Sequence, residues 1–514
     1  MVWSGVHLRL FFSSFREWSS RGGHLPTMDQ PNTSEDPGKG IHGSQANGSV
    51  KEDVYVIGVP RHEDFLEEYE PYDHRVVDKP TSNFETLFHL LKGSLGSGIL
   101  AMHNAFMHAG YVIGVVGVLA IAVIYTHCMH ILIASEYELC RRHQRPSLNY
   151  PTTAKLAFAA GPPPAKMASK YAGHVLNWLQ VIYQAGTLCV YIVFISTNLK
   201  EVVDAYIPDS MDLRLYMVVV VVPLVLILVF IRDLKTLAPF SAAGNLITFV
   251  GFGIILYYIA APDEGSDVWG LPPISTRNAV GSLDDMPLFF GMVLFALDAI
   301  GVVMPLENNM KTPRGFGGYF GVLNQAMSFI AILYSAIAFL GYIKYGPDCK
   351  GSITLNIPQK EWLAQSVKVM LSAAMCVTFA VQAYVAVDIL WNYYLKPILI
   401  KNPHLRLIEG VVRALIVLVC FALAAAIPEL GLFISLFGAF CLSSVGLIYP
   451  ALLQSFTFWY IPGLMSKHHP KNWEGQETKR MLMLFKNVLI LFFAMFGLII
   501  GSYTSLRDIV ARYQ

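Results

Sequence analysis

Two long apolar segments of this chain are interrupted by polar residues and glycine, and the two interruptions lie five apolar segments apart. The interrupted stretches read Gly93-Ser94-Leu95-Gly96-Ser97-Gly98 and Asp298-Ala299-Ile300-Gly301. An unpaired backbone N–H or C=O costs several kcal/mol in hydrocarbon, so a broken helix persists there only where something else meets its polar groups. Paired breaks of this kind are typical of secondary transporters and mark the binding site.

The composition places the rest of the chain in a membrane. Hydrophobic residues make up 54% of the sequence and charged residues 14%, whereas about 25% of a soluble domain is charged. With roughly 20 apolar residues per span, the sequence predicts an all-α polytopic membrane protein of about eleven transmembrane helices. These spans begin near Phe84, Tyr111, Val175, Leu213, Leu237, Pro287, Tyr319, Trp362, Ile408, Leu430 and Leu482. The net charge of +1 argues against a nucleic-acid partner and leaves membrane lipid as the surrounding partner.

The loop charges predict the orientation. Lys and Arg are roughly twice as frequent in the loops on the side of the N-terminus, which is therefore expected to be cytosolic. Residues 1–82 are rich in Gly, Ser, Pro and acidic residues and are expected to form a disordered cytosolic tail. Spans one to five are expected in 83–261 and spans six to ten in 262–460. An inner loop, helix eleven and a short non-cytosolic C-terminus are expected in 461–514.

The first break offers a site for an anion. A helix that resumes after the glycines directs its free N–H groups back at the gap, where a substrate carboxylate is favourable. We therefore predict a substrate-binding role for Gly93, Ser94, Gly96, Ser97 and Gly98. The alternative is close packing of small residues at a helix crossing.

The second break carries an acid inside the membrane. A carboxylate there costs roughly 2.5 to 3.5 kcal/mol on insertion scales, so Asp298 needs a proton, a substrate ammonium or a backbone partner. We assign it to substrate binding and proton coupling, and its neighbours Phe295 and Gly301 to substrate binding. The structural alternative is that Asp298 caps the broken helix.

Three further residues are candidates by their chemistry and spacing. His89, just before the first break, can gain and lose a proton near neutral pH and is a candidate for proton coupling. Gln184 and Tyr191 lie on one polar face of span three and are predicted to line the substrate path. Each could instead make only interhelical hydrogen bonds, worth about 0.6 kcal/mol apiece in one membrane protein.

The seven cysteines are dispersed without a Cys-x-x-Cys pair, so the sequence signals neither a metal site nor a cofactor. Cys349 in an outer loop and Cys189 in the outer half of span three are expected to form a disulfide. The spans contain none of the hydrolase or metalloprotease motifs, so an enzyme is not expected.

Four motifs resemble one family. They are Asn83-Phe-Glu-Thr-Leu-Phe-His-Leu-Leu-Lys-Gly-Ser-Leu-Gly-Ser-Gly98, Tyr191-Ile-Val-Phe with Asn198-Leu-Lys200, Gly301-Val-Val-Met-Pro-Leu-Glu-Asn308, and Gly351-Ser-Ile-Thr-Leu-Asn-Ile-Pro358. Together they are similar to the animal proton-coupled amino acid transporters of the amino acid/auxin permease family. The resemblance implies a LeuT-like fold of two inverted five-helix repeats, small neutral amino acids and a proton as substrates, and plasma-membrane or lysosomal residence. It also implies a link to nutrient signalling. The family usually has Glu-Gly-Ile-Gly where this chain has Asp298-Ala299-Ile300-Gly301, which puts substrate size and proton affinity in question.

The combined prediction is a proton-driven symporter of the alanine, glycine and proline class. Its substrate carboxylate is expected near Gly96 to Gly98 and its ammonium near Phe295 to Asp298. Two alternatives stay open. Sodium coupling could use oxygens of Ser94, Ser97 and Thr378, and an amino-acid-sensing receptor could signal through the cytosolic tail instead of moving solute.

Overall fold

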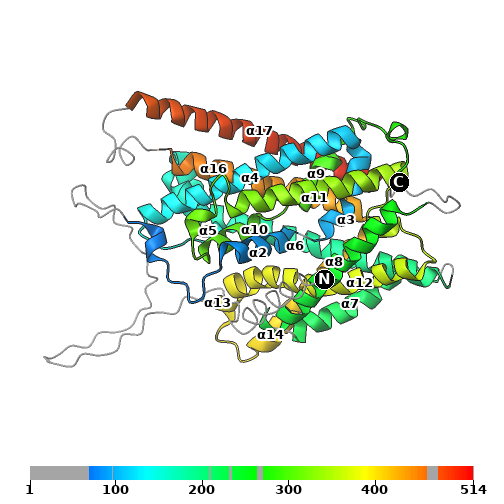
Figure 1. Cartoon of the computed structure of the whole chain (residues 1–514). Coiled ribbons are helices and arrows are strands. Elements are labelled where there is room, and N and C mark those ends of the chain that lie inside the picture. Colours follow the sequence, from blue (N-terminus) through cyan, green and yellow to red (C-terminus); the bar gives the residue numbers. More distant parts are fainter. Residues whose placement is uncertain are drawn as a thin grey trace, which may run out of the picture. The chain divides into compact units, whose positions relative to one another are not determined.

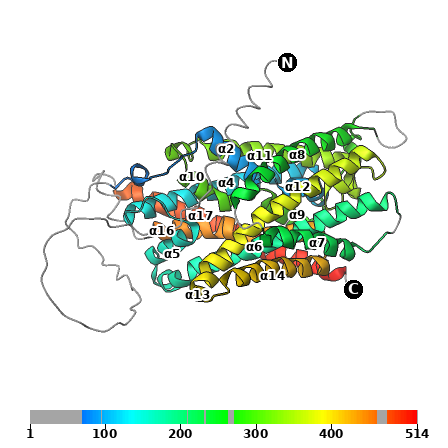
Figure 2. The ribbon, with the colours of Figure 1, turned by 90° about the horizontal axis from the view of Figure 1, so that it is seen from below.

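The computed structural model describes residues 69–94, 96–207, 210–230, 234–262, 270–459 and 473–512. Within these ranges the regular structure is helical, apart from one isolated bridge between Thr81 and Met310. Figures 1 and 2 show long helices that run side by side, with α6 (Pro163–Asp204) packed against α5 (Tyr150–Ala160) and α12 (Trp362–Val387). The all-α prediction is confirmed.

The remaining helices fall into groups that follow the predicted spans. The first half holds α2 (Asn83–Ser94), α3 (Ser97–Ala109), α4 (Tyr111–Arg142), α7 (Leu213–Phe230) and α8 (Leu234–Ala260). The second half holds α9 (Met286–Ala296), α10 (Ile300–Asn308), α11 (Val322–Tyr345), α13 (Lys396–Leu399), α14 (Leu405–Ala426), α15 (Leu430–Phe437), α16 (Tyr449–Thr457) and α17 (Trp473–Ala511). Short pieces that matter below are η1 (Pro71–His74), η5 (Ile353–Leu355) and the π-helical segments η6 (Asp388–Leu395) and η7 (Gly438–Ile448).

Ten helical segments of the described chain are long and apolar enough to cross a membrane. The remaining predicted span is the first one, which is split into α2 of 12 residues and α3 of 13 residues. Each half is too short to cross alone, but together they have the roughly 20 residues that a bilayer requires. The assignment of 83–261 and 262–460 to two repeats stays a prediction.

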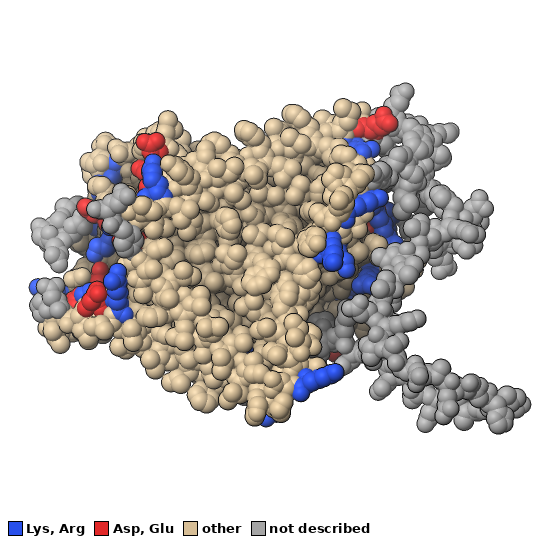
Figure 3. Space-filling model, turned by 180° about the vertical axis from the view of Figure 1, so that it is seen from behind, with Lys and Arg blue, Asp and Glu red and all other residues tan. Residues whose placement is uncertain are grey.

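The surface has the character of a membrane protein. In Figure 3 most of the Lys, Arg, Asp and Glu side chains gather towards two ends of the visible face, with a broad uncharged band between them. Large apolar side chains such as Val123, Phe249 and Phe492 are exposed. Because soluble proteins rarely expose extended apolar surface, this band is the part that lipid covers. The chain is therefore an integral multi-pass membrane protein. Below, the end of the bundle that carries α5 and α13, which is expected to face the cytosol, is called the inner end.

Local sequence rules explain where several helices begin and end. The side chain of Asn149 accepts a hydrogen bond from the Thr152 amide and caps α5. Pro163 occupies the first turn of α6, where its missing N–H has no cost. Gly110 separates α3 from α4 with a φ of 79°, and an added Cβ would lie 2.7 Å from the Ala279 carbonyl oxygen, so only glycine fits this turn.

One boundary of the predicted tail is wrong. Residues 1–68 lie outside the described residues, but residues 71–82 are ordered against the helices. The chain forms η1, Arg75 pairs with Glu307 at 2.9 Å, and the Thr81 amide donates to the Asn309 carbonyl at 2.8 Å. These contacts with the end of α10 fix a segment whose polar composition alone predicted disorder.

Candidate functional site

The first span is broken where the glycines predict it. The α2 helix ends at Ser94, α3 begins at Ser97, and Gly96 between them is extended at φ −125° and ψ −153°. The Tyr334 hydroxyl of α11 donates to the Ser94 carbonyl, which satisfies one backbone acceptor that the break releases. No side chain caps the start of α3. The first amides of α3 therefore have no partner within their own helix and can bind an anion.

The second break lies at the predicted acid. The α9 helix ends at Ala296 and α10 begins at Ile300. The Tyr125 hydroxyl donates to Oδ1 of the Asp298 carboxylate at 3.4 Å, and the Tyr183 hydroxyl and the Ile300 amide lie close enough to interact with this carboxylate. The N-cap residue of α10 is Ala299, so the alternative that Asp298 caps this helix stays a prediction. In this structure Asp298 therefore faces two tyrosines, Tyr125 of the second span and Tyr183 of the third.

The two breaks meet inside the bundle. A Cβ added at Gly98 of α3 would lie 2.6 Å from the Cα of Ala296, so the start of α3 touches the end of α9. On the inner side, a Cβ added at Gly93 would lie 3.4 Å from the Val302 side chain of α10. A helix N-terminus carries partial positive charge and a C-terminus partial negative charge. The start of α3 and the end of α9 therefore offer opposite charges side by side.

The third span supplies polar groups to this point, as its polar face predicts. The Tyr191 hydroxyl of α6 interacts with Ser97 and Gln382, and it lies 3.9 Å from a Cβ added at Gly96. Three turns away on α6, the side chain of Gln180 lies 3.9 Å from a Cβ added at Gly301. The structure therefore brings residues of the first, third, sixth and eighth spans to the breaks.

Gln184 and Phe295 complete the set. The Oε1 atom of Gln184 is buried and has no hydrogen-bond partner among the described residues. Its neighbour Tyr183, which contacts Asp298, packs its ring against that of Phe295 with the centroids 5.9 Å apart. A buried amide oxygen without a donor favours a ligand that brings an N–H group.

Burial differs between the two sides of the breaks. The outer halves are buried over most of their length, from Ser97 to Phe106 in α3 and from Leu288 to Ala296 in α9. On the inner side, Gly93 and Gly301 are exposed although each faces a neighbouring helix. Two backbone positions on the inner side are therefore accessible, whereas the outer halves are covered by neighbouring helices.

His89 lies in a charged stretch of α2. It is partly buried and interacts electrostatically with Lys92 and Glu85, which are one turn away on the same helix. The structure thus places the proton-coupling candidate on the inner half of span one, before the break. Its role in coupling stays a prediction.

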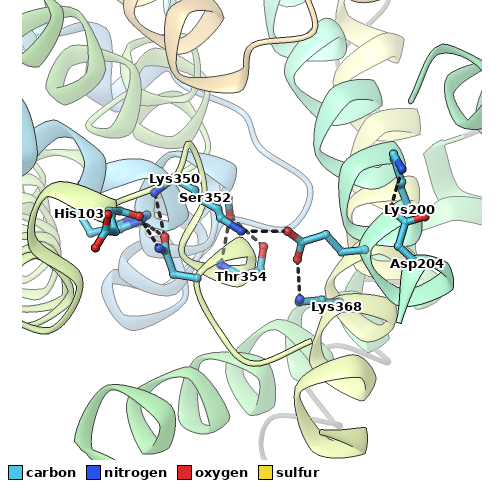
Figure 4. Close-up of polar contacts among 10 residues, drawn as sticks. His103, Lys200, Asp204, Lys350, Ser352, Thr354 and Lys368 are labelled. Atoms are coloured by element: carbon cyan, nitrogen blue, oxygen red, sulfur yellow. Dashed lines mark hydrogen bonds and ion pairs between the residues drawn. The ribbon is translucent and has the colours of Figure 1, made fainter. Parts of the chain in front are cut away.

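A polar network ties the helices together at the outer end (Figure 4). His103 of α3 is fully buried and its Nε2 lies 3.1 Å from Oδ1 of Asn356, which also accepts from the Lys350 amide at 2.9 Å. Glu201 of α6 bridges Lys350 at 3.3 Å and Lys368 of α12 at 2.6 Å. The loop around η5 is thereby fastened to the first, third and eighth spans.

A cavity of about 590 Å³ opens beside this network. Both polar and charged groups line it, including Asn104, Lys350, Asp285, Glu429 and Arg512. The cavity lies on the outer side of the buried halves α3 and α9. It can admit a small zwitterion from the outer end, but the packed residues separate it from the breaks.

The predicted disulfide between Cys189 and Cys349 is wrong. All seven cysteines are free thiols, and the Cys189 thiol donates to the Cys420 carbonyl of α14 at 3.3 Å. Burial raises the pKa of the Cys349 thiol to about 12, so little of the reactive thiolate forms. The spacing in the sequence did not show that Cys189 faces span nine.

Sequence reasoning missed the tyrosines and the outer ion pair. Tyr125, Tyr183 and Tyr334 read as apolar members of their spans, yet each directs its hydroxyl at a break. The available signal was that a buried tyrosine usually finds a hydrogen-bond partner. Glu201 and Lys368 are far apart in the chain, and neither stands out in its loop or span.

Comparison with known proteins identifies the family. Residues 79–504 match the sequence profile of the family described as transmembrane amino acid transporter protein. The chain is 36% identical over 447 residues to the proton-coupled amino acid transporter-like protein pathetic of Drosophila melanogaster, covering 87% of this chain and 89% of that protein. It is 25% identical over 438 residues to the probable amino acid transporter skat-1 of Caenorhabditis elegans, covering 83% and 89%. Among solved structures it is similar to a mutant manganese transporter of Eremococcus coleocola, with 13% identity, a TM-score of 0.41, and 84% and 98% of the two chains covered.

Proposed function

Because the chain belongs to the transmembrane amino acid transporter family, we propose that it is a proton-coupled symporter of small neutral amino acids that works by alternating access. The names of the two relatives support amino acids as the solute, and the name of the first supports a proton as the coupling ion. No covalent chemistry is needed for this activity.

The observation that carries the proposal is the contact between the start of α3 and the end of α9 at Gly98 and Ala296. The α-carboxylate of the substrate would bind the free amides at Ser97 and Gly98. Its α-ammonium would bind the last carbonyls of α9 near Phe295 and the unpartnered oxygen of Gln184. An amino acid carries its two charges a few ångströms apart, and the two helix ends present opposite partial charges side by side.

The surroundings favour a small side chain. The rings of Tyr183, Phe295 and Tyr191 are buried and stand around the two helix ends. A large substrate would have to displace these packed rings. Because overpacking a filled core costs about 1–3 kcal/mol, its binding would be weaker by about the same amount. Glycine, alanine and proline avoid this cost.

The difference in burial supports alternating access. Exposed Gly93 and Gly301 lie on the inner side of the breaks, and the ion pairs of Glu201 close the outer end. We assign this arrangement to a state closed at the outer end by Glu201 and still held at the inner end by the ion pair of Arg75 and Glu307. In the outward-facing state the outer halves α3 and α9 would separate from the third and eighth spans and join the outer cavity to the breaks.

Uptake into proteoliposomes tests the proposal. A one-unit pH gradient supplies about 1.4 kcal/mol per proton, and a 100 mV potential adds about 2.3 kcal/mol per charge. Together they correspond to accumulation of a neutral solute by several hundredfold. Labelled alanine, glycine and proline should accumulate under an imposed gradient, and a proton ionophore should abolish this. Accumulation that requires sodium at constant pH, and ignores the ionophore, would replace the proton with sodium.

We also propose residence in the plasma membrane or the lysosomal membrane, with the N-terminus in the cytosol. An epitope at the N-terminus should be stained only after the cells are permeabilised. Staining of intact cells would reverse the orientation used above.

A further inference from the structure

Two buried acids lie at the inner end of the bundle, away from the breaks, on elements that are linked through the Leu148 backbone. Glu136 lies near the end of α4 and Glu307 near the end of α10, and each is 1% exposed. Arg75, from the segment before the first span, places its guanidinium 2.9 Å from the Glu307 carboxylate, and its side chain is 6% exposed. Burying a charged group is costly unless an opposite charge or hydrogen bonds compensate it, so each of these three buried groups needs a partner.

Few other charges face this group. Tyr72 of η1 lies under the Arg75 guanidinium at 4.8 Å and packs against Tyr137 of α4 at 5.0 Å. Burial, followed by the nearby Glu307 carboxylate, raises the pKa of Tyr72 above its ordinary value, so its phenol stays neutral. The other titratable neighbours are Cys140 of α4 and Arg145 of the following loop, and Arg145 is exposed. Glu138 on α4 is already paired with Arg141 and Arg142. Of the described cations around the two acids, Arg75 is the buried one.

The hydrogen bonds of the group are incomplete. Glu136 accepts from the Leu148 amide through Oε1 at 3.2 Å, and the Asn308 side chain donates to the Leu148 carbonyl at 3.1 Å. Three buried acceptor atoms have no donor among the described residues: Glu136 Oε2, Glu307 Oε1 and Asn308 Oδ1. If one carboxyl oxygen carries a proton, it becomes a hydrogen-bond donor and can donate to one of the other unpartnered acceptors.

The charge balance leads to the same result. If both acids were ionised, the group would hold two negative charges and one positive charge, and burying an uncompensated charge costs several kcal/mol. We propose that Glu136 and Glu307 share one bound proton in this closed arrangement, and that this proton is released at the inner end when Arg75 and α10 separate. The inference rests on the proposed proton-coupled symport, and it assigns the proton's exit to this acid pair.

The position of the two acids and Arg75 couples movement of α10 to release of the proton. Arg75 also donates to the Pro146 carbonyl at 2.8 Å, so the acids, the segment before span one and the loop after α4 are fastened together. That loop leads into α5, which packs against α6 and α16. Movement of α10 relative to these helices would pull Glu307 from Arg75 and admit water to both carboxylates. Solvated carboxylates release a shared proton.

The test compares Glu136→Gln with wild type and with Glu138→Gln, a matched control two residues away on the same helix. Each intact chain is placed in proteoliposomes, and two measurements are made with labelled alanine. The first is exchange at equal pH on both sides, which needs no net proton movement. The second is accumulation under a one-unit pH gradient. Glu136→Gln should retain exchange of alanine. It should lose the accumulation of alanine, about tenfold, that a one-unit pH gradient supplies. Glu138→Gln should retain both.

The outcomes separate the two claims. Gradient-driven accumulation by Glu136→Gln equal to that of wild type would overturn the acid-pair proposal and leave the symporter intact. If wild type itself ignores the pH gradient, the proposed function fails and the acid-pair proposal with it. If Glu136→Gln does not exchange, infrared spectra of the purified wild type and variant decide. Loss of a protonated-carboxyl band in the variant supports the proposal, and an unchanged band overturns it.

Discussion

Replacing Gly98 with alanine tests the contact on which the proposed substrate site depends. The new Cβ would lie 2.6 Å from the Cα of Ala296, where ordinary contact begins at 3.4 Å. The atom it meets belongs to the backbone of α9, so no side-chain rotation can relieve the clash. The start of α3 and the end of α9 would have to separate by close to an ångström.

The cost of this separation can be bounded. Overpacking a filled core costs about 1–3 kcal/mol, which corresponds to a factor of about 5 to 150 in an equilibrium constant. Displacing binding groups by an ångström can reduce turnover by about 100-fold. We therefore expect Gly98→Ala to lower alanine uptake at subsaturating concentration by about 5- to 150-fold.

The assay is initial-rate uptake in proteoliposomes, normalised to the amount of folded protein. Gly253→Ala in α8 is the matched control, because a Cβ added there meets nothing within 4 Å. The control should transport like wild type and gain slightly in helix stability, by up to about 1 kcal/mol. Wild-type uptake by Gly98→Ala would mean that α3 and α9 do not touch at this position, and the proposed site would lose its basis.

Four further changes test other parts of the protein. Tyr191→Phe removes the hydroxyl that faces the first break and should raise the apparent KM of initial-rate uptake by about 2- to 12-fold, the equivalent of about 0.5–1.5 kcal/mol. Glu201→Gln leaves the fully buried Lys368 without its partner and should destabilise the protein by about 3–5 kcal/mol in thermal unfolding. Lys350→Gln, which removes a half-exposed partner of the same carboxylate, should cost less than about 1 kcal/mol in the same thermal unfolding measurement. Deleting residues 1–68 should leave amino acid uptake unchanged if the protein is a transporter. A receptor that signals through its tail would lose its signal after this deletion. If the shortened chain keeps both uptake and signalling at wild-type levels, the receptor alternative is refuted.

Local signals in the sequence were enough to find the two breaks. Glycine destabilises a helix interior by about 1 kcal/mol relative to alanine, so three glycines within six residues predict an interruption wherever the surrounding segment is apolar. Asp298 gave the second signal because an acid inside a membrane needs a partner. Both inferences concern residues next to one another in the chain, and the structure confirms both breaks.

The partners at the breaks could not be predicted in this way. Tyr334 meets Ser94 across 240 residues of sequence, and Tyr125 meets Asp298 across 173. Nothing in the spacing within one span fixes which neighbouring helix a tyrosine faces. The same limit explains the wrong disulfide, because Cys189 faces Cys420 of span nine and not the loop that holds Cys349.

The segment before the first span shows why composition fails for short stretches. A disorder prediction averages over many residues and asks whether they can bury enough apolar surface to offset their chain entropy. Residues 71–82 do not need a core of their own, because Arg75 is placed beside an acid that is already buried at the end of α10. Leaving Glu307 without its cation would cost about 3–5 kcal/mol, and the hydrogen bonds from Arg75 to Pro146 and from the Thr81 amide to Asn309 hold the segment as well. The order of this segment therefore depends on contacts with residues far away in the chain, and a change at Glu307 should loosen the segment as well as the acid pair.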